Sequence, residues 1–128
     1  MRIEHVAVWT RHLERMRQFY QHYFDARTGD VYRSANRPGF TSYFLSFPYG
    51  GARLELMGLP DLAAAPGGPA VGYAHLALSL GSPAAVEALV ARMRDDGVRI
   101  LSQPRVTGDG YFEAVIEDPD GNHIELTV

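Results

Sequence analysis

Short runs of alternating hydrophobic and polar residues, separated by turns rich in glycine and proline, occupy most of the chain. Such alternation is typical of strands with one covered face. It predicts strands at 3–9, 31–33, 40–47 and 52–57 in the first half, and at 73–80, 98–101, 111–117 and 122–128 in the second.

Two stretches have helical spacing instead, one in each half. The first follows a possible capping Thr10 and contains Leu13, Met16, Phe19 and Tyr23. The second follows Ser82 as N-cap and Pro83 at the first helical position, contains Val86, Leu89, Val90 and Met93, and is expected to stop at Gly97.

The two halves repeat each other at an offset of 70 residues. Residues 3–8 align with 73–78, and residues 51–56 align with 121–126, with His on His and Glu on Glu. Each half then has one strand, one helix and three further strands. The sequence predicts an α+β fold of two pseudo-symmetric modules, 1–58 and 71–128, joined by a linker at 59–70 in one domain.

One histidine and one glutamate recur in each module: His5 with Glu55, and His75 with Glu125. In both modules the histidine comes from the first strand and the glutamate from the last. Packing of the modules as a pseudo-symmetric pair would bring two imidazoles and two carboxylates together. That set suits a divalent transition metal and leaves two octahedral positions for water or substrate.

Taken singly, each of these four residues has an ordinary interpretation. A strand histidine is usually a hydrogen-bonded core residue, and a strand glutamate usually faces solvent or an arginine. The repetition favours the metal site. In addition, both glutamates lie between large aliphatic residues, as expected for a strand with one covered face and one face open to a cavity: Leu54, Leu56, Ile124 and Leu126.

Four other residues are predicted substrate contacts, each with a structural alternative. Trp9 shares the face of His5 and would line a pocket or fill core. Arg53 would hold an anion or pair with an acid. Tyr43 would form a wall or pack in the sheet, and His123 would line the cavity or be exposed. His12 and His22 are interpreted as surface residues.

Composition narrows the functional classes. The net charge of −3 and the lack of a basic run argue against a nucleic-acid surface. The absence of cysteine excludes disulfides, Cys-ligated zinc and a cysteine nucleophile. No apolar stretch reaches the ~18 residues of a membrane span, and Glu4 and His5 interrupt a signal-peptide pattern, so we expect no membrane association and a cytoplasmic location.

The sequence resembles the vicinal oxygen chelate superfamily, the glyoxalase/bleomycin resistance/dioxygenase group, over nearly its whole length. The most similar segments are residues 72–77 and 117–126, with 3–8 also similar. The resemblance implies two βαβββ modules that form a curved, partly open, barrel-like mixed sheet around a metal. The order His5, Glu55, His75, Glu125 most resembles glyoxalase I (lactoylglutathione lyase). Trp9 departs from the glutathione-using bacterial members, which often have Arg there.

The resemblance implies a lyase or isomerase with one divalent metal (Ni, Co, Zn, Mn or Fe) and a small vicinal-oxygen substrate, such as the hemithioacetal of a 2-oxoaldehyde. Glu125 or Glu55 would be the base, and the reaction would pass through a metal-stabilised enediolate. The alternatives are a non-catalytic binding protein of the antibiotic-binding type and an Fe(II)-dependent extradiol-type dioxygenase. A homodimer is expected, with the ligands from one chain or from exchanged modules.

Overall fold

The computed structural model describes residues 1–64 and 68–128. The chain divides into two compact units, Met1–Ala65 and Pro66–Val128. Part of the predicted linker, residues 65–67, lies outside the described residues.

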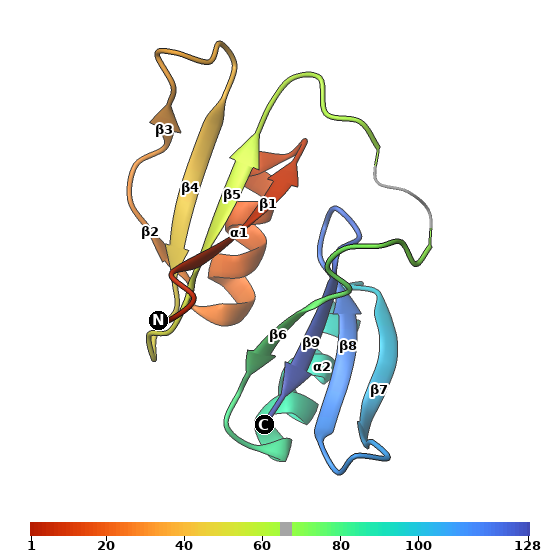
Figure 1. Cartoon of the computed structure of the whole chain (residues 1–128). Coiled ribbons are helices and arrows are strands. Elements are labelled where there is room, and N and C mark those ends of the chain that lie inside the picture. Colours follow the sequence, from red (N-terminus) through yellow and green to blue (C-terminus); the bar gives the residue numbers. More distant parts are fainter. Residues whose placement is uncertain (65–67) are drawn as a thin grey trace. The chain divides into compact units, whose positions relative to one another are not determined.

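The first unit is a mixed sheet with one helix on one face (Figure 1). Its strand order is β1-β5-β4-β2, with β3 also paired to β4; β1 and β5 run parallel and the other pairs antiparallel. In chain order the elements are β1 (His5–Thr10), α1 (Leu13–Phe24), β2 (Arg27–Thr28), β3 (Tyr32–Arg33), β4 (Thr41–Ser46) and β5 (Arg53–Gly58).

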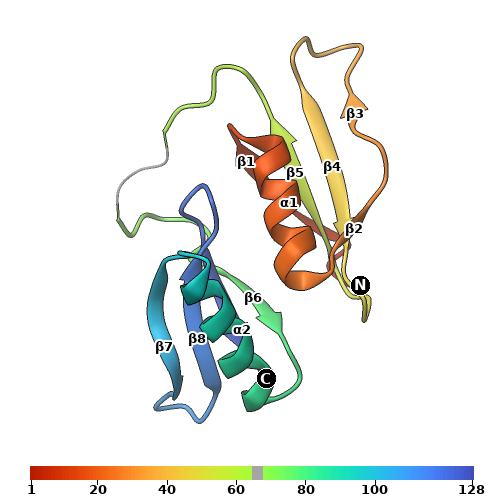
Figure 2. The same cartoon turned by 180° about the vertical axis from the view of Figure 1, so that it is seen from behind.

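The second unit has the same plan, with its helix against one face of a four-stranded sheet (Figure 2). Its strand order is β6-β9-β8-β7, and β6 runs parallel to β9. In chain order the elements are β6 (Leu76–Ser79), α2 (Pro83–Asp95), β7 (Ile100–Val106), β8 (Phe112–Glu117) and β9 (His123–Thr127). The α+β class and the repeated plan predicted from the sequence are confirmed.

Each unit has its own core between helix and sheet. The core consists of one stripe of the helix and alternate residues of the strands, because successive strand side chains point to opposite faces. In the first unit the buried residues include Met16, Tyr20, Leu45, Leu54 and Leu56. In the second they include Val86, Val90, Met93, Ile116, Ile124 and Leu126.

The helix boundaries agree with the sequence prediction in one unit and correct it in the other. Ser82 caps α2 by accepting a hydrogen bond from the Ala85 backbone N–H at 3.2 Å, and Gly97 follows the helix with a positive φ of 81°. The capping role predicted for Thr10 is wrong. The N-cap of α1 is His12, and the Thr10 hydroxyl instead accepts from the His12 backbone N–H at 2.9 Å.

Several strand predictions also change. β1 spans His5–Thr10 where 3–9 was predicted, and β7 spans Ile100–Val106 where only 98–101 was predicted. The two-residue strand β2 was not predicted, because Arg27 and Thr28 are too few to show alternation. The strand predicted over 73–80 is shorter than expected. β6 begins at Leu76, so His75 lies immediately before the strand rather than within it.

The turn between β8 and β9 is organised by one buried carboxylate, Asp118. It accepts hydrogen bonds from the backbone N–H of Asp120 at 3.0 Å, and from the backbone N–H and side-chain amide of Asn122 at 2.9 and 2.8 Å. Burial nevertheless raises the pKa of Asp118. At the offset of 70 the first unit has Pro48, which offers no such acceptor.

We expect Asp118→Ala to lower the free energy of unfolding by about 1–3 kcal/mol, because three donors lose a buried acceptor. Urea unfolding followed by circular dichroism measures the change. Glu87→Ala, on the exposed side of α2, is the control and should stay within about 0.5 kcal/mol of the wild type. Equal unfolding midpoints for the two variants would contradict the role of Asp118.

Candidate metal centre

The first unit brings His5 and Glu55 together on the face of the sheet opposite α1. The Nε2 atom of His5 lies 3.9 Å from the Oε2 atom of Glu55. The Glu55 side chain is 13% exposed, whereas its neighbours Leu54 and Leu56 are fully buried on the helix side. The strand is therefore covered on one face and presents a carboxylate on the other.

The second unit repeats this pair. The Nε2 atom of His75 lies 3.4 Å from the Oε2 atom of Glu125, whose side chain is 18% exposed. Ile124 and Leu126 are buried on the opposite face of β9. Both pairs have an accessible histidine and a mostly covered glutamate.

The two pairs arise from the same backbone register. Ala7 is the partner of Glu55 between β1 and β5, and Ala77 is the partner of Glu125 between β6 and β9. Residues two apart in a strand share a face, so Ala7 lies on the face of His5 beside Glu55. Its small side chain leaves room for the glutamate to reach the imidazole.

The donor chemistry of these residues fits a divalent transition metal. Each pair offers one imidazole nitrogen and one carboxylate oxygen, which are suitable ligands for Ni, Co, Zn, Mn or Fe. Among the described residues, no three histidine, aspartate or glutamate side chains lie close enough together to hold a metal ion. Each unit by itself holds one such pair.

A charged and aromatic cluster surrounds His5. Glu4 accepts hydrogen bonds from the Nδ1 atom of His5 and from the Arg53 guanidinium, which together lower the pKa of Glu4. The Arg53 guanidinium lies over the Phe44 ring at 4.3 Å. The His5 ring meets Phe44 edge-on, with 5.3 Å between centroids. Arg53 is therefore paired with an acid, the structural alternative given for it above.

Trp9 lies further along β1, on the same face as His5, and the residue is 44% exposed. Its ring meets Phe40 edge-on at 6.2 Å. The Arg37 guanidinium lies 5.5 Å from the Trp9 ring centroid and 5.7 Å from that of Phe40. Within the described part of the chain, no carboxylate forms an ion pair with Arg37. This cluster presents an aromatic surface and a positive charge.

Tyr43 lies on the other face of the sheet, against α1. It is buried, and its hydroxyl donates a hydrogen bond to Glu14 at 2.6 Å, which raises the pKa of Tyr43 and lowers that of Glu14. Tyr43 therefore does not share the face of His5, Trp9 and Glu55. Of the two interpretations of Tyr43, this placement matches sheet packing.

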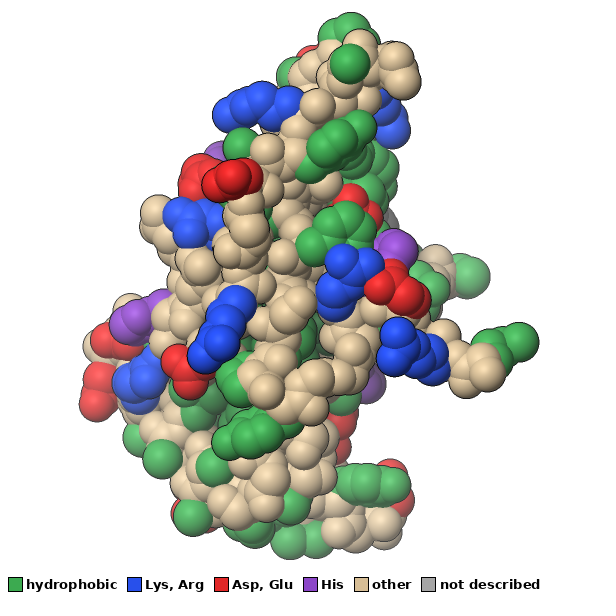
Figure 3. Space-filling model, turned by 90° about the vertical axis from the view of Figure 1, so that its left-hand side faces the viewer, with side chains coloured by type: hydrophobic (Ala, Val, Ile, Leu, Met, Phe, Trp, Pro, Cys, Tyr) green, Lys and Arg blue, Asp and Glu red, His purple; other side chains and the backbone are tan. Residues whose placement is uncertain are grey.

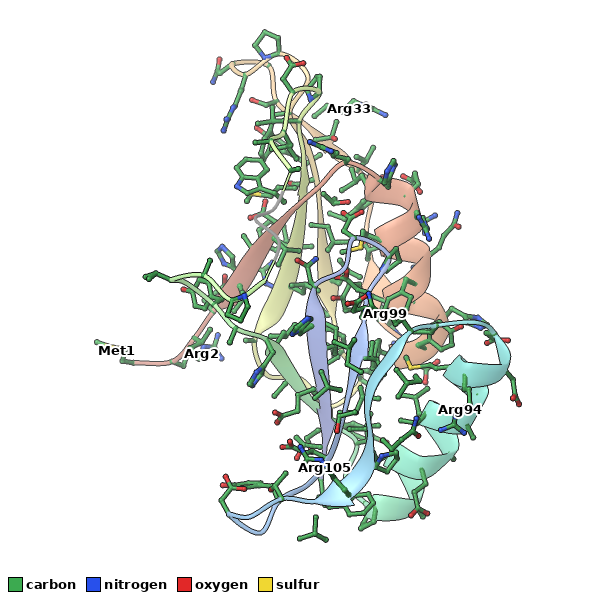
Figure 4. The ribbon with its side chains drawn as sticks, turned by 90° about the vertical axis from the view of Figure 1, so that its right-hand side faces the viewer. Met1, Arg2, Arg33, Arg94, Arg99 and Arg105 are labelled. Atoms are coloured by element: carbon green, nitrogen blue, oxygen red, sulfur yellow. The ribbon has the colours of Figure 1, made fainter. Side chains whose placement is uncertain are left out.

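The charged residues beside Glu125 are mostly paired. Arg99 lies 3.2 Å from Glu117, and Arg105, on β7, lies 3.9 Å from Glu113 (Figure 4). His123 is exposed on the face of Glu125. Figure 3 shows acidic and basic side chains intermixed on the visible face, without a patch of one sign.

Sequence reasoning missed Glu4, Phe44 and the Arg37–Phe40 pair. Strict alternation assigns Glu4 to the face opposite His5, but β1 begins at His5 and Glu4 is free of that rule. Phe44 shares a face with Glu55, its register partner, which a strand pattern alone does not reveal. Arg37 lies between β3 and β4, where no periodicity fixes its direction.

Comparison with known proteins shows the family. The family model described as the Glyoxalase/Bleomycin resistance protein/Dioxygenase superfamily matches residues 2–126. No curated protein matches the chain at a significant level. In the described part of the chain, no helix is both long and apolar enough to cross a membrane.

Solved structures share the fold at low sequence identity. A glyoxylase/bleomycin resistance protein/dioxygenase domain from Frankia sp. EAN1pec has 16% identity and a TM-score of 0.83, with 98% of this chain and 95% of that chain covered. A glyoxalase family protein from Enterococcus faecalis has 23% identity and a TM-score of 0.80, covering 98% and 96%. The trypanothione-dependent glyoxalase I of Leishmania major has 25% identity and a TM-score of 0.78, covering 99% and 86%.

Proposed function

The chain belongs to the Glyoxalase/Bleomycin resistance protein/Dioxygenase superfamily, and from this premise we propose that it is a metal-dependent lyase or isomerase of the glyoxalase type. Its substrate would be a small molecule with two vicinal oxygens, such as the hemithioacetal of a 2-oxoaldehyde. The observation that carries the proposal is the His–Glu pair that both units form in the same register.

The proposed ligands are His5, Glu55, His75 and Glu125. Four protein ligands leave two octahedral positions for the two substrate oxygens. A dioxygenase of the facial-triad type uses two histidines and one carboxylate, so the second carboxylate here favours the lyase. We propose a homodimer, with each ligand set drawn from one chain or from exchanged units.

When bound, the metal supplies a Lewis acid that polarises a substrate carbonyl and makes the adjacent C–H more acidic. A glutamate of the set takes the proton from that carbon and returns it to the neighbouring carbon. Glu125 is our choice of base. The other carboxylates on its face, Glu113 and Glu117, are paired with arginines, whereas Glu125 lies beside a histidine. Trp9 and the adjacent Arg37 would contact the remainder of the substrate.

The first prediction concerns metal content. We expect about one divalent metal ion per chain in purified protein, and a loss of most of it in His5→Ala and Glu125→Ala, because each variant removes one ligand. Elemental analysis measures it after incubation with Ni, Co, Zn, Mn or Fe(II). His12→Ala, an exposed histidine outside both pairs, should keep its metal. A metal-free wild type would favour the binding-protein alternative.

The second prediction concerns the base. Glu125→Gln should lower kcat for hemithioacetal isomerisation by about 100-fold or more, because an amide cannot accept the proton from carbon. The free energy of unfolding should change by less than about 1 kcal/mol, since the side chain keeps its size. Steady-state kinetics measures kcat, and urea unfolding measures the stability. The same measurements on Glu55→Gln identify which of the two glutamates is the base. Full activity in both variants would refute the mechanism.

The third prediction concerns Trp9. Trp9→Ala should lower kcat/KM for the hemithioacetal of phenylglyoxal about 3–10-fold relative to that of methylglyoxal, both with the same thiol. One aromatic contact contributes about 0.5–1.5 kcal/mol, and only phenylglyoxal has a ring. Tyr49→Ala, a fully exposed tyrosine in a turn, is the control and should leave the ratio unchanged. An unchanged ratio in Trp9→Ala would remove Trp9 from the substrate site.

A further inference from the structure

The two ring nitrogens of His5 have different acidic neighbours. Nδ1 is hydrogen-bonded to the Glu4 carboxylate, and Nε2 lies 3.9 Å from the Glu55 carboxylate. An ionised carboxylate only accepts hydrogen bonds, so the nitrogen that bonds to it must carry the proton. In a neutral His5 ring that nitrogen is Nδ1, which leaves the lone pair of Nε2 on the side of Glu55.

Glu4 is itself held in place. Its carboxylate also accepts from the Arg53 guanidinium, and Arg53 lies against the Phe44 ring. The His5 ring meets the same Phe44 edge-on. Glu4, Arg53, Phe44 and His5 thus form one cluster of mutual contacts around the imidazole.

The second unit lacks this cluster. At the offset of 70, Ala74 stands in place of Glu4 and His123 in place of Arg53. Within the described residues, the Nδ1 atom of His75 has no carboxylate partner. The two His–Glu pairs are alike in that Nε2 of the histidine faces the glutamate. They differ in the partner of the Nδ1 atom.

We propose that Glu4 is a positioning residue that holds His5 in the Nδ1-protonated tautomer, with Nε2 free to bind a metal, and that this support exists in the first unit only. The inference rests on the proposed function, because it concerns the strength of one ligand of that metal. A carboxylate behind a ligating histidine fixes its tautomer and raises its basicity, and losing such a partner typically costs 10–100-fold in metal affinity.

The contacts alone do not require this role. Exposed ion pairs contribute little to stability, and Glu4 and Arg53 are both accessible. If Glu4 forms only a surface ion pair, its removal should change neither the free energy of unfolding nor the metal affinity appreciably. A positioning role predicts an effect on His5 and on metal affinity without a matching loss of stability.

The first experiment reads the tautomers directly in the metal-free protein. Long-range ¹H–¹⁵N NMR at about pH 8, where an ordinary imidazole is neutral, distinguishes a protonated from an unprotonated ring nitrogen. We expect His5 to be protonated on Nδ1 and to lose this preference in Glu4→Ala. Glu4→Gln keeps one acceptor oxygen, which the Arg53 guanidinium needs, and turns an amide N–H toward Nδ1, so it should lose the preference as well. His75 in the same spectra is an internal reference and should not change.

The second experiment measures metal affinity by competition with a chromophoric chelator, with Ni and with Zn. We expect Glu4→Ala to bind about 10-fold or more weakly than the wild type, and Glu4→Gln not to recover the loss, because its amide N–H faces Nδ1. Glu14→Gln is the matched control, because Glu14 is also paired with an arginine in this unit but touches no histidine. Its affinity should equal that of the wild type.

The outcomes separate the two proposals. Suppose that the wild type binds metal normally. The role of Glu4 would then be overturned, and the proposed function would stand, if His5 and His75 had the same tautomer mixture. Equal metal affinity in Glu4→Ala and Glu14→Gln would have the same consequence. A wild type that binds no divalent metal would overturn the proposed function, and with it the role of Glu4 in metal binding. A loss of stability in Glu4→Ala as large as its loss of affinity would assign Glu4 a structural role.

Discussion

In both units the first strand pairs in parallel with the last, and the helix between them packs on one face of the resulting sheet. Parallel neighbours require a crossover, and α1 and α2 begin those crossovers. The helix buries every second residue of β5 and β9. Glu55 and Glu125 occupy the alternate positions, so the packing that stabilises each unit also fixes where its carboxylate points.

This arrangement places each mostly covered carboxylate beside an imidazole. The Glu55 and Glu125 side chains remain 13% and 18% exposed, which limits the cost of their desolvation, and His5 and His75 lie beside them. The alanine in the neighbouring strand keeps that approach open. A larger residue at Ala7 or Ala77 would occupy the space on which the pair depends, even though neither alanine is a candidate ligand.

The repeat made most of the fold and the paired residues predictable. Alternation over β5 and β9 and helical spacing in α1 and α2 are local signals, and the offset of 70 joined them into two equivalent units. What failed depended on geometry without periodicity. Thr10 bonds to His12 rather than capping α1. Glu4 reaches His5 because it precedes the strand, where alternation does not apply.

The difference between the halves also bears on how independently each can vary. Glu4 and Arg53 of the first unit correspond to Ala74 and His123 of the second. Because each unit has its own core, one half could change without refolding the other. The support of one histidine can therefore be altered by mutation while the other unit keeps its own histidine, glutamate and core unchanged.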